Sequence, residues 1–152
     1  MKKEEGITLI ILTVTIIIML ILATVAVYNN NIVDKAKFQL IFANMTLIQI
    51  KVNVISEKTN FDGDTTRYIG EKLKDVPNKS QIAGEALTTQ ELEDENYYIY
   101  NQETLNNIGL EGIKLEKDEV YIVNYSTLEV IYPKGCIGLD GEVKRKLSEM
   151  QP

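Results

Sequence analysis

The chain has 152 residues and a formal net charge of −6, with 22 acidic and 16 basic side chains. An acidic chain repels phosphate backbones, so we expect no nucleic-acid partner. The sequence contains no histidine and a single cysteine, Cys136, which excludes an intrachain disulfide, the Ser-His and Cys-His catalytic pairs and the commonest zinc ligand. We therefore expect neither an enzyme nor a cofactor.

The first predicted element is a long apolar helix over Ile7–Tyr28. These twenty-two residues contain no charge, glycine or proline. At 1.5 Å per residue, a helix of this length reaches about 33 Å, which is enough to cross a hydrocarbon core of about 30 Å. A secretory signal has a shorter apolar region and a small-residue cleavage site, which Ala23-Thr24-Val25-Ala26 matches only weakly. The sequence therefore predicts a membrane-spanning segment, with lipid as its partner.

The residues before this helix resemble a known processing signal. A short charged leader, Met1-Lys2-Lys3-Glu4-Glu5, ends at Gly6 and is followed by Ile7, Thr8 and Leu9. This order resembles the cleavage region of type IV prepilins, a family that includes the pseudopilins of type II secretion and competence systems. The resemblance implies that a prepilin peptidase cuts after Gly6 and that Ile7 becomes an N-methylated terminus.

The same resemblance implies a location and a set of partners. It places the leader in the cytoplasm and the C-terminal domain outside the cell, on a single-pass membrane protein that can enter a surface filament. Its implied partners are other pilin subunits and, indirectly, an assembly ATPase and a platform protein. We therefore expect a structural subunit of a pilus, secretion or competence filament.

The chain departs from this family at Ile11. The family usually places a glutamate at the fifth mature position, and Ile11 stands there in this sequence. A carboxylate inside an apolar helix costs about 2.5–3.5 kcal/mol to insert, and in filaments of this family its partner is thought to be the terminal amine of a neighbouring subunit. Ile11 cannot offer that ion pair. The departure favours a minor subunit, and it leaves open an alternative, a single-pass anchored extracellular binding module that does not polymerise.

We expect the helix to continue beyond the membrane, because no glycine or proline occurs from Ile7 to Phe61. Over residues 29–60, apolar side chains recur every three or four positions, which indicates an amphipathic helix. They form two sets, the first being Val33, Ala36, Leu40, Leu47, Ile50 and Val54, and the second Phe38, Ile41, Met45, Ile48, Val52 and Ile55. This stripe is wider than one small sheet needs. We expect it to pack against its own domain and against neighbouring subunits.

The helix should end at the turn-forming sequence Asn60-Phe61-Asp62-Gly63-Asp64. Asp62 and Asp64 are also weak candidates for metal ligands, but the other ligands of a calcium loop are missing at the expected spacing. We therefore expect a turn and no metal. The elements expected next are a short helix over Thr65–Lys74, an irregular connection over Asp75–Leu87, and a short acidic helix or loop over Thr89–Glu95.

The last third of the chain predicts strands. Asn101 can cap a short helix over Gln102–Ile108 that stops at Gly109, and the apolar period then changes to two. The expected strands are Ile113–Leu115, Val120–Asn124, Leu128–Pro133 and Glu142–Leu147, with Tyr97–Tyr100 as an edge strand or connector and Cys136 in a Gly-rich loop. The run Asn106–Tyr132 also looks like the C-terminal part of pilin-like proteins from Gram-positive bacteria.

Together these patterns predict an α+β fold of the type IV pilin-like kind. A long N-terminal helix, membrane-spanning in its first half and amphipathic in its second, packs on a small C-terminal antiparallel sheet. The expected parts are a leader over 1–6, a transmembrane and filament-core helix over 7–28, its amphipathic continuation over 29–60, and a small globular domain over 61–152. Carboxylates that could serve an exported enzyme have no recognisable catalytic spacing; they are Asp62, Asp64, Glu91, Glu93 and Asp94.

Overall fold

The computed structural model describes residues 2–151. They form two compact units that divide between Ala36 and Lys37. One helix, α1 (Lys2–Asp62), runs through this division, so that its first part makes up the first unit and its second part belongs to the second.

Helix α1 ends where the sequence predicts. Gly63 follows its last residue with a φ of +72°, a conformation that glycine adopts without steric cost. The Gly63 N–H donates a hydrogen bond to the carbonyl of Thr59, with a nitrogen–oxygen distance of 2.7 Å. This bond caps one of the carbonyls that the helix end leaves open.

The second unit contains a five-stranded antiparallel sheet in the order β1-β2-β3-β4-β5, in which each strand pairs with the next along the chain. The strands are β1 (Glu71–Lys72), β2 (Tyr97–Tyr100), β3 (Tyr121–Asn124), β4 (Val130–Ile137) and β5 (Val143–Lys146). The α-helices of this unit besides α1 are α2 (Lys79–Ala83), α3 (Gln102–Asn107) and α4 (Leu147–Met150). Short 3-10 helices are η1 (Thr65–Arg67), η2 (Leu73–Asp75) and η3 (Glu91–Glu93).

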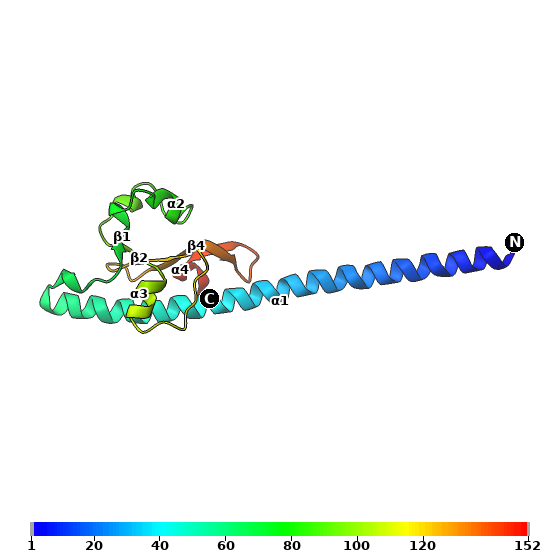
Figure 1. The fold of residues 1–152 in the computed structure, drawn as a ribbon, viewed down its shortest axis with the longest axis horizontal. Helices are drawn as coiled ribbons and strands as arrows, with labels where there is room; N and C mark the ends of the chain where they lie inside the picture. Colours follow the sequence, from blue (N-terminus) through cyan, green and yellow to red (C-terminus); the bar gives the residue numbers. More distant parts are fainter. Residues whose placement is uncertain (1, 152) are drawn as a thin grey trace. The chain divides into compact units, whose positions relative to one another are not determined.

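Both faces of the central strands β2 and β3 are buried, whereas the edge strands β1 and β5 are exposed or partly buried. The second part of α1 lies along one face, and the segment that carries α2 covers the other (Figure 1). Side chains alternate between them: Tyr98 and Tyr100 join the cluster that contains α1, whereas Tyr97 and Ile99 join the cluster under residues 73–92. The expected α+β arrangement, a long helix on a small antiparallel sheet, is confirmed.

Some of the predicted elements differ from those in the structure, and tertiary packing explains the differences. The range Thr65–Lys74 forms η1, β1 and the start of η2 instead of one helix. Gly70 lies within it at a φ of +99°, and a Cβ there would come within 2.6 Å of the Ile99 carbonyl oxygen. The chain therefore needs an extended, glycine-only bend to reach the sheet. The range Asp75–Leu87 is also more regular than expected, because it contains α2.

Three other differences concern the sheet. Ile113–Leu115 is no strand; the Leu115 N–H instead donates to the Gln102 side chain, with a nitrogen–oxygen distance of 2.8 Å. Tyr97–Tyr100 is an interior strand, because β1 forms the edge beside it. Cys136 lies in β4 and is buried, which raises the pKa of its thiol. The helix over residues 102–107, its cap at Asn101 and the last strand agree with expectation.

Candidate membrane helix and the surfaces of the sheet domain

The apolar part of α1 is the strongest functional feature of the chain. By length and composition, this helix can cross a membrane. From Ile7 to Tyr28, the large apolar side chains expose 48–67% of their surface. A helix whose described side chains are apolar and exposed on every side belongs in an apolar medium.

Hydroxyl groups in this segment are compatible with lipid. The side chains of Thr13, Thr15 and Thr24 each donate a hydrogen bond to the carbonyl four residues earlier, at 2.7–2.8 Å. A hydroxyl that is satisfied within its own helix does not need water. These three threonines therefore do not oppose insertion.

The residues of the expected processing signal lie together in the first turns of α1. Ile7, Thr8, Leu9 and Ile11 are all exposed. Gly6 has no left-handed φ, and a Cβ added to it would meet nothing within 4 Å. Because a glycine inside a helix costs about 1 kcal/mol relative to alanine, the fold gives no reason for glycine at this position.

The second part of α1 presents two apolar faces. The set Phe38, Ile41, Met45, Ile48 and Val52 is buried against the sheet, with Ile55 partly buried beside it. The other expected set does not pack on the domain, since Leu40, Leu47, Ile50 and Val54 expose 61%, 47%, 56% and 42% of their surface. The one wide stripe predicted from the sequence is thus two stripes, and only one of them contacts the sheet.

We call the exposed set the outer stripe, defined as Leu40, Ala43, Leu47, Ile50 and Val54. Ala43 is exposed and completes the stripe, although it was not among the apolar residues expected on this face. Val33 and Ala36 are exposed as well and belong to the first unit.

Polar side chains fix the position of α1 on the sheet. Ser56 donates a hydrogen bond to the carbonyl of Tyr125 at 3.0 Å, and the Gln49 amide donates to the carbonyl of Leu128 at 2.9 Å. The Tyr125 hydroxyl in turn accepts from the N–H of Ile69 at 3.0 Å and donates to its carbonyl at 2.9 Å. The buried face of α1 is therefore held in one register.

Asp62 and Asp64 stabilise the end of α1. Arg67 forms an ion pair with Asp62 and lies 3.7 Å from an oxygen of Asp64. Asp64 also accepts hydrogen bonds from the hydroxyl and the N–H of Thr66, which lower the pKa of its carboxyl. Among the side chains that the structure describes, no three of Asp, Glu, His or Cys gather to form a metal site.

The acidic residues around η3 also have structural contacts. Glu91 accepts from the N–H of Thr88 at 2.7 Å, and this bond lowers the pKa of the Glu91 carboxyl. Glu93 pairs with Lys79 at 2.5 Å, and Asp94 accepts from the N–H of Asn96. These carboxylates cap turns and pair with cations, as those at the end of α1 do.

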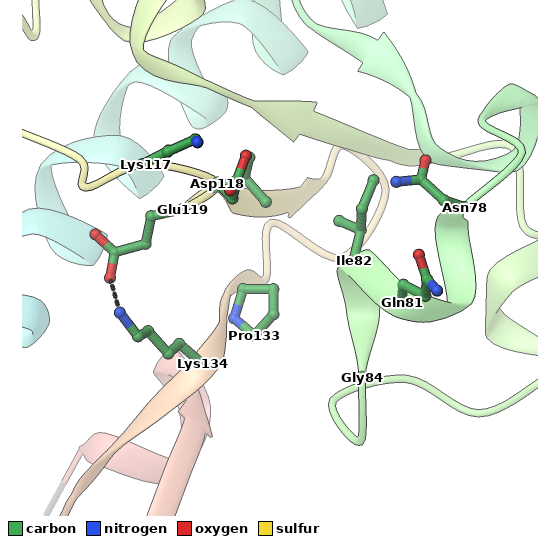
Figure 2. Close-up of a pocket in the computed structure, with 10 residues that line it drawn as sticks. Asn78, Gln81, Ile82, Gly84, Lys117, Asp118, Glu119, Pro133 and Lys134 are labelled. Carbon is green, nitrogen blue, oxygen red and sulfur yellow. Dashed lines mark hydrogen bonds and ion pairs between the residues drawn. The ribbon is translucent and has the colours of Figure 1, made fainter.

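A hollow of about 470 Å³ lies beside the start of β3. Figure 2 shows Asn78, Gln81 and Ile82 on one side and Glu119 with Lys134 on the other. The complete lining is Asn78, Gln81, Ile82, Gly84, Lys117, Asp118, Glu119, Val120, Pro133 and Lys134.

The charged groups of this hollow are already paired in part. Glu119 lies 3.3 Å from Lys134 and accepts a hydrogen bond from Tyr132. Partial burial alone would raise the pKa of Glu119, but the bonds from Tyr132, Glu116 and Lys134 outweigh it and lower that pKa. The lining contains no serine, cysteine or histidine, so this hollow holds none of the common nucleophile–base pairs.

The chain matches no known family model, and no curated protein and no solved structure is significantly similar to it. The function must therefore be argued from the two parts of α1 and from the residues before them.

Proposed function

We propose that this chain is a type IV pilin-like or pseudopilin subunit. A prepilin peptidase removes Met1–Gly6, and Ile7 becomes the N-methylated terminus. Ile7–Tyr28 anchors the subunit in the membrane and later enters the core of a filament. The observation that carries this proposal is an exposed, uncharged and mostly apolar helix that continues into an amphipathic half on a small antiparallel sheet.

Gly6 supports the processing step. The fold leaves open space around it and does not need its conformational freedom, so a requirement outside the folded chain explains it better. A peptidase that binds the chain closely at the cleaved bond supplies such a requirement.

The apolar helix suits both states of such a subunit. Lipid tails are about as apolar as its side chains, so the exchange of lipid for protein neighbours is close to neutral in free energy. An assembly ATPase and a platform protein would then drive the exchange. In this arrangement the leader is cytoplasmic and the sheet domain is extracellular.

Ile11 favours a minor subunit. Its side chain is exposed and apolar, so it cannot pair with the terminal amine of a neighbour. A subunit without this ion pair is better suited to a few places in a filament, such as its tip, than to every position along it.

The test is processing of the full chain in cells that also make a prepilin peptidase. Intact mass should show loss of Met1–Gly6 and gain of one methyl group. Gly6→Val should abolish cleavage without affecting insertion. Gly112→Val is the matched control, because Gly112 also has open space around it and no left-handed φ, and this variant should be cleaved normally.

A wild-type chain that stays uncut, or a Gly6→Val chain that is cut as the wild type is, would contradict the proposal.

Ile11 also favours a second candidate, a membrane-anchored extracellular module that does not polymerise. That candidate predicts an intact leader and no labelled filaments by immunogold electron microscopy in cells with an active assembly ATPase.

A further inference from the structure

Three exposed apolar side chains gather in the hairpin between β4 and β5. Ile137 exposes 38% of its surface, Leu139 71% and Val143 47%. Ile137 and Val143 are direct partners across the two strands, and Leu139 lies in the turn between them. Among the described residues, every other large apolar side chain that is exposed lies on α1. Scattered apolar residues need no explanation, but a cluster confined to one turn marks an interaction surface.

The turn that carries Leu139 is tied together by its own polar groups. The N–H of Gly138 donates a hydrogen bond to the carbonyl of Glu142, with a nitrogen–oxygen distance of 2.7 Å. The ammonium group of Lys144 lies 2.6 Å from a carboxylate oxygen of Asp140 and 3.3 Å from one of Glu142. The two acids and one lysine leave one unbalanced negative charge on the hairpin.

The hairpin lies at the end of the sheet domain where that domain's part of α1 begins (Figure 1). Cys136, the residue before Ile137, is buried in the same core cluster as Phe38 and Ile41. Burial raises the pKa of the Cys136 thiol, and the nearby charge of Lys37 opposes that rise. Lys37 is the first residue of the sheet domain, so the three apolar side chains leave the core beside the point where the chain enters this domain.

The apolar segment ends a short distance along the chain from this point. Lys37 follows Tyr28, the last residue of that segment, by nine positions. Nine residues span about 14 Å as a helix and no more than about 32 Å when fully extended. The headgroup region adds about 5–8 Å on each side of the hydrocarbon core. When Ile7–Tyr28 spans a bilayer, the length of the chain alone therefore keeps the hairpin end of the domain close to the membrane surface.

We propose that the β4–β5 hairpin inserts Leu139, Ile137 and Val143 into the lipid interface of the membrane that anchors the chain. Burial of apolar surface drives this contact, because the unbalanced negative charge of the hairpin gives it no attraction to anionic headgroups. The short tether raises the effective concentration of lipid at the hairpin, so a weak contact is sufficient. The contact rests on insertion of Ile7–Tyr28, but it requires neither cleavage after Gly6 nor a filament.

The test measures the depth of single fluorescent labels on the full chain in phosphatidylcholine vesicles. The label is attached to Leu139→Cys in a Cys136→Ala background, and a nitroxide near the start of a lipid acyl chain quenches labels that reach the interface. Phe61→Cys is the matched control, because Phe61 exposes 94% of its surface and lies at the other end of α1. The label at position 139 should be quenched, and the label at position 61 should not.

Two further variants make the result decisive. Ile17→Cys, within the apolar segment, reports insertion itself, and its label should be quenched by a nitroxide deep in the acyl chain. Ile137→Thr and Val143→Thr together keep the branched side chains that suit strands but exchange apolar groups for hydroxyls. They should lower the equilibrium constant for lipid contact at position 139 by at least about tenfold. Near-ultraviolet circular dichroism of the tyrosines confirms that each variant is folded.

A quenched label at position 17 with an unquenched label at position 139 would overturn the proposal and leave the proposed function intact. Equal quenching at positions 139 and 61 would contradict it as well, because the contact would then not belong to the hairpin. Quenching at position 139 that requires added phosphatidylglycerol would also overturn it, because headgroup charge would then drive the contact. The Gly6→Val chain should be quenched as the wild type is, so failure of processing and failure of lipid contact are separate results.

Discussion

Ile48 and Ile50 lie two residues apart on α1, but only the replacement of Ile48 by alanine should destabilise the domain strongly. Ile48 exposes 0% of its surface and lies in the core between α1 and the sheet, whereas Ile50 exposes 56% and lies on the outer stripe. The two substitutions remove the same atoms from the same helix, so any difference between them measures burial alone.

The expected cost at Ile48 follows from the atoms removed. Ile48→Ala deletes three carbon atoms, worth about 2.4 kcal/mol at about 0.8 kcal/mol per buried methylene group. The cavity that remains raises the loss to as much as about 5 kcal/mol. Ile50→Ala should change the free energy of unfolding by less than about 0.5 kcal/mol, because its side chain is exposed and alanine is the better helix former.

The assay is thermal unfolding of the full chain in detergent, at concentrations where it is monomeric. The chain has no tryptophan, so near-ultraviolet circular dichroism reports on its buried tyrosines. Ile48→Ala should lower Tm by about 10–20 °C, and Ile50→Ala by no more than about 2 °C. Equal shifts for the two variants would refute the assignment of the two faces of α1.

Three other outcomes test the packing of the sheet domain. Gly63→Ala should lower the free energy of unfolding by about 1–2 kcal/mol, because Gly63 has a left-handed φ. Gly70→Ala should lower it clearly more, because its Cβ would also meet the Ile99 carbonyl oxygen at 2.6 Å. Denaturant titration compares the two variants, and equal losses would contradict the close approach at Gly70. Tyr125→Phe should lower the free energy of unfolding by about 1–3 kcal/mol in the same titration, because it removes the hydroxyl that hydrogen-bonds the N–H and the carbonyl of Ile69. An unchanged midpoint would show that these two bonds do not stabilise the domain. Burial raises the pKa of Tyr121 to about 12, so the stability it contributes is complete below pH 10 and is lost as the pH rises toward 12. The tyrosinate absorbance that Tyr121→Phe removes should therefore appear together with unfolding in an alkaline titration, and its appearance well before unfolding would contradict the burial of Tyr121.

Local signals in the sequence were sufficient for the elements that depend on neighbouring residues. The end of α1 at Gly63 and the cap of α3 at Asn101 follow from the chemistry of turns and caps. Strand β3 and the first half of β4 follow from apolar residues between turn formers. The second half of β4 does not, because Gly135 and Cys136 were expected in a loop and lie in the strand instead.

The errors arose where distant residues decide the structure. Nothing near Gly70 in the sequence indicates that Ile99 approaches its backbone, so the segment around it looked helical. The strand Tyr97–Tyr100 has no polar alternation because both its faces are covered, and that depends on residues 73–92 folding over the sheet.

The two apolar sets on α1 show the same limit. Both sets have helical spacing, and the sequence alone could not tell which one meets the sheet. The structure separates them by burial: Ile48 belongs to the core and Ile50 to the outer stripe. The function proposed for Gly6 and Ile7 depends on chemistry outside the fold, so it stays a prediction.

The most direct test of the proposed function is the intact mass of the natural protein isolated from the membranes of its own cells. A chain that begins at N-methylated Ile7 is the expected result. A chain that still carries Met1, or one that has been cut near Ala26, would contradict it.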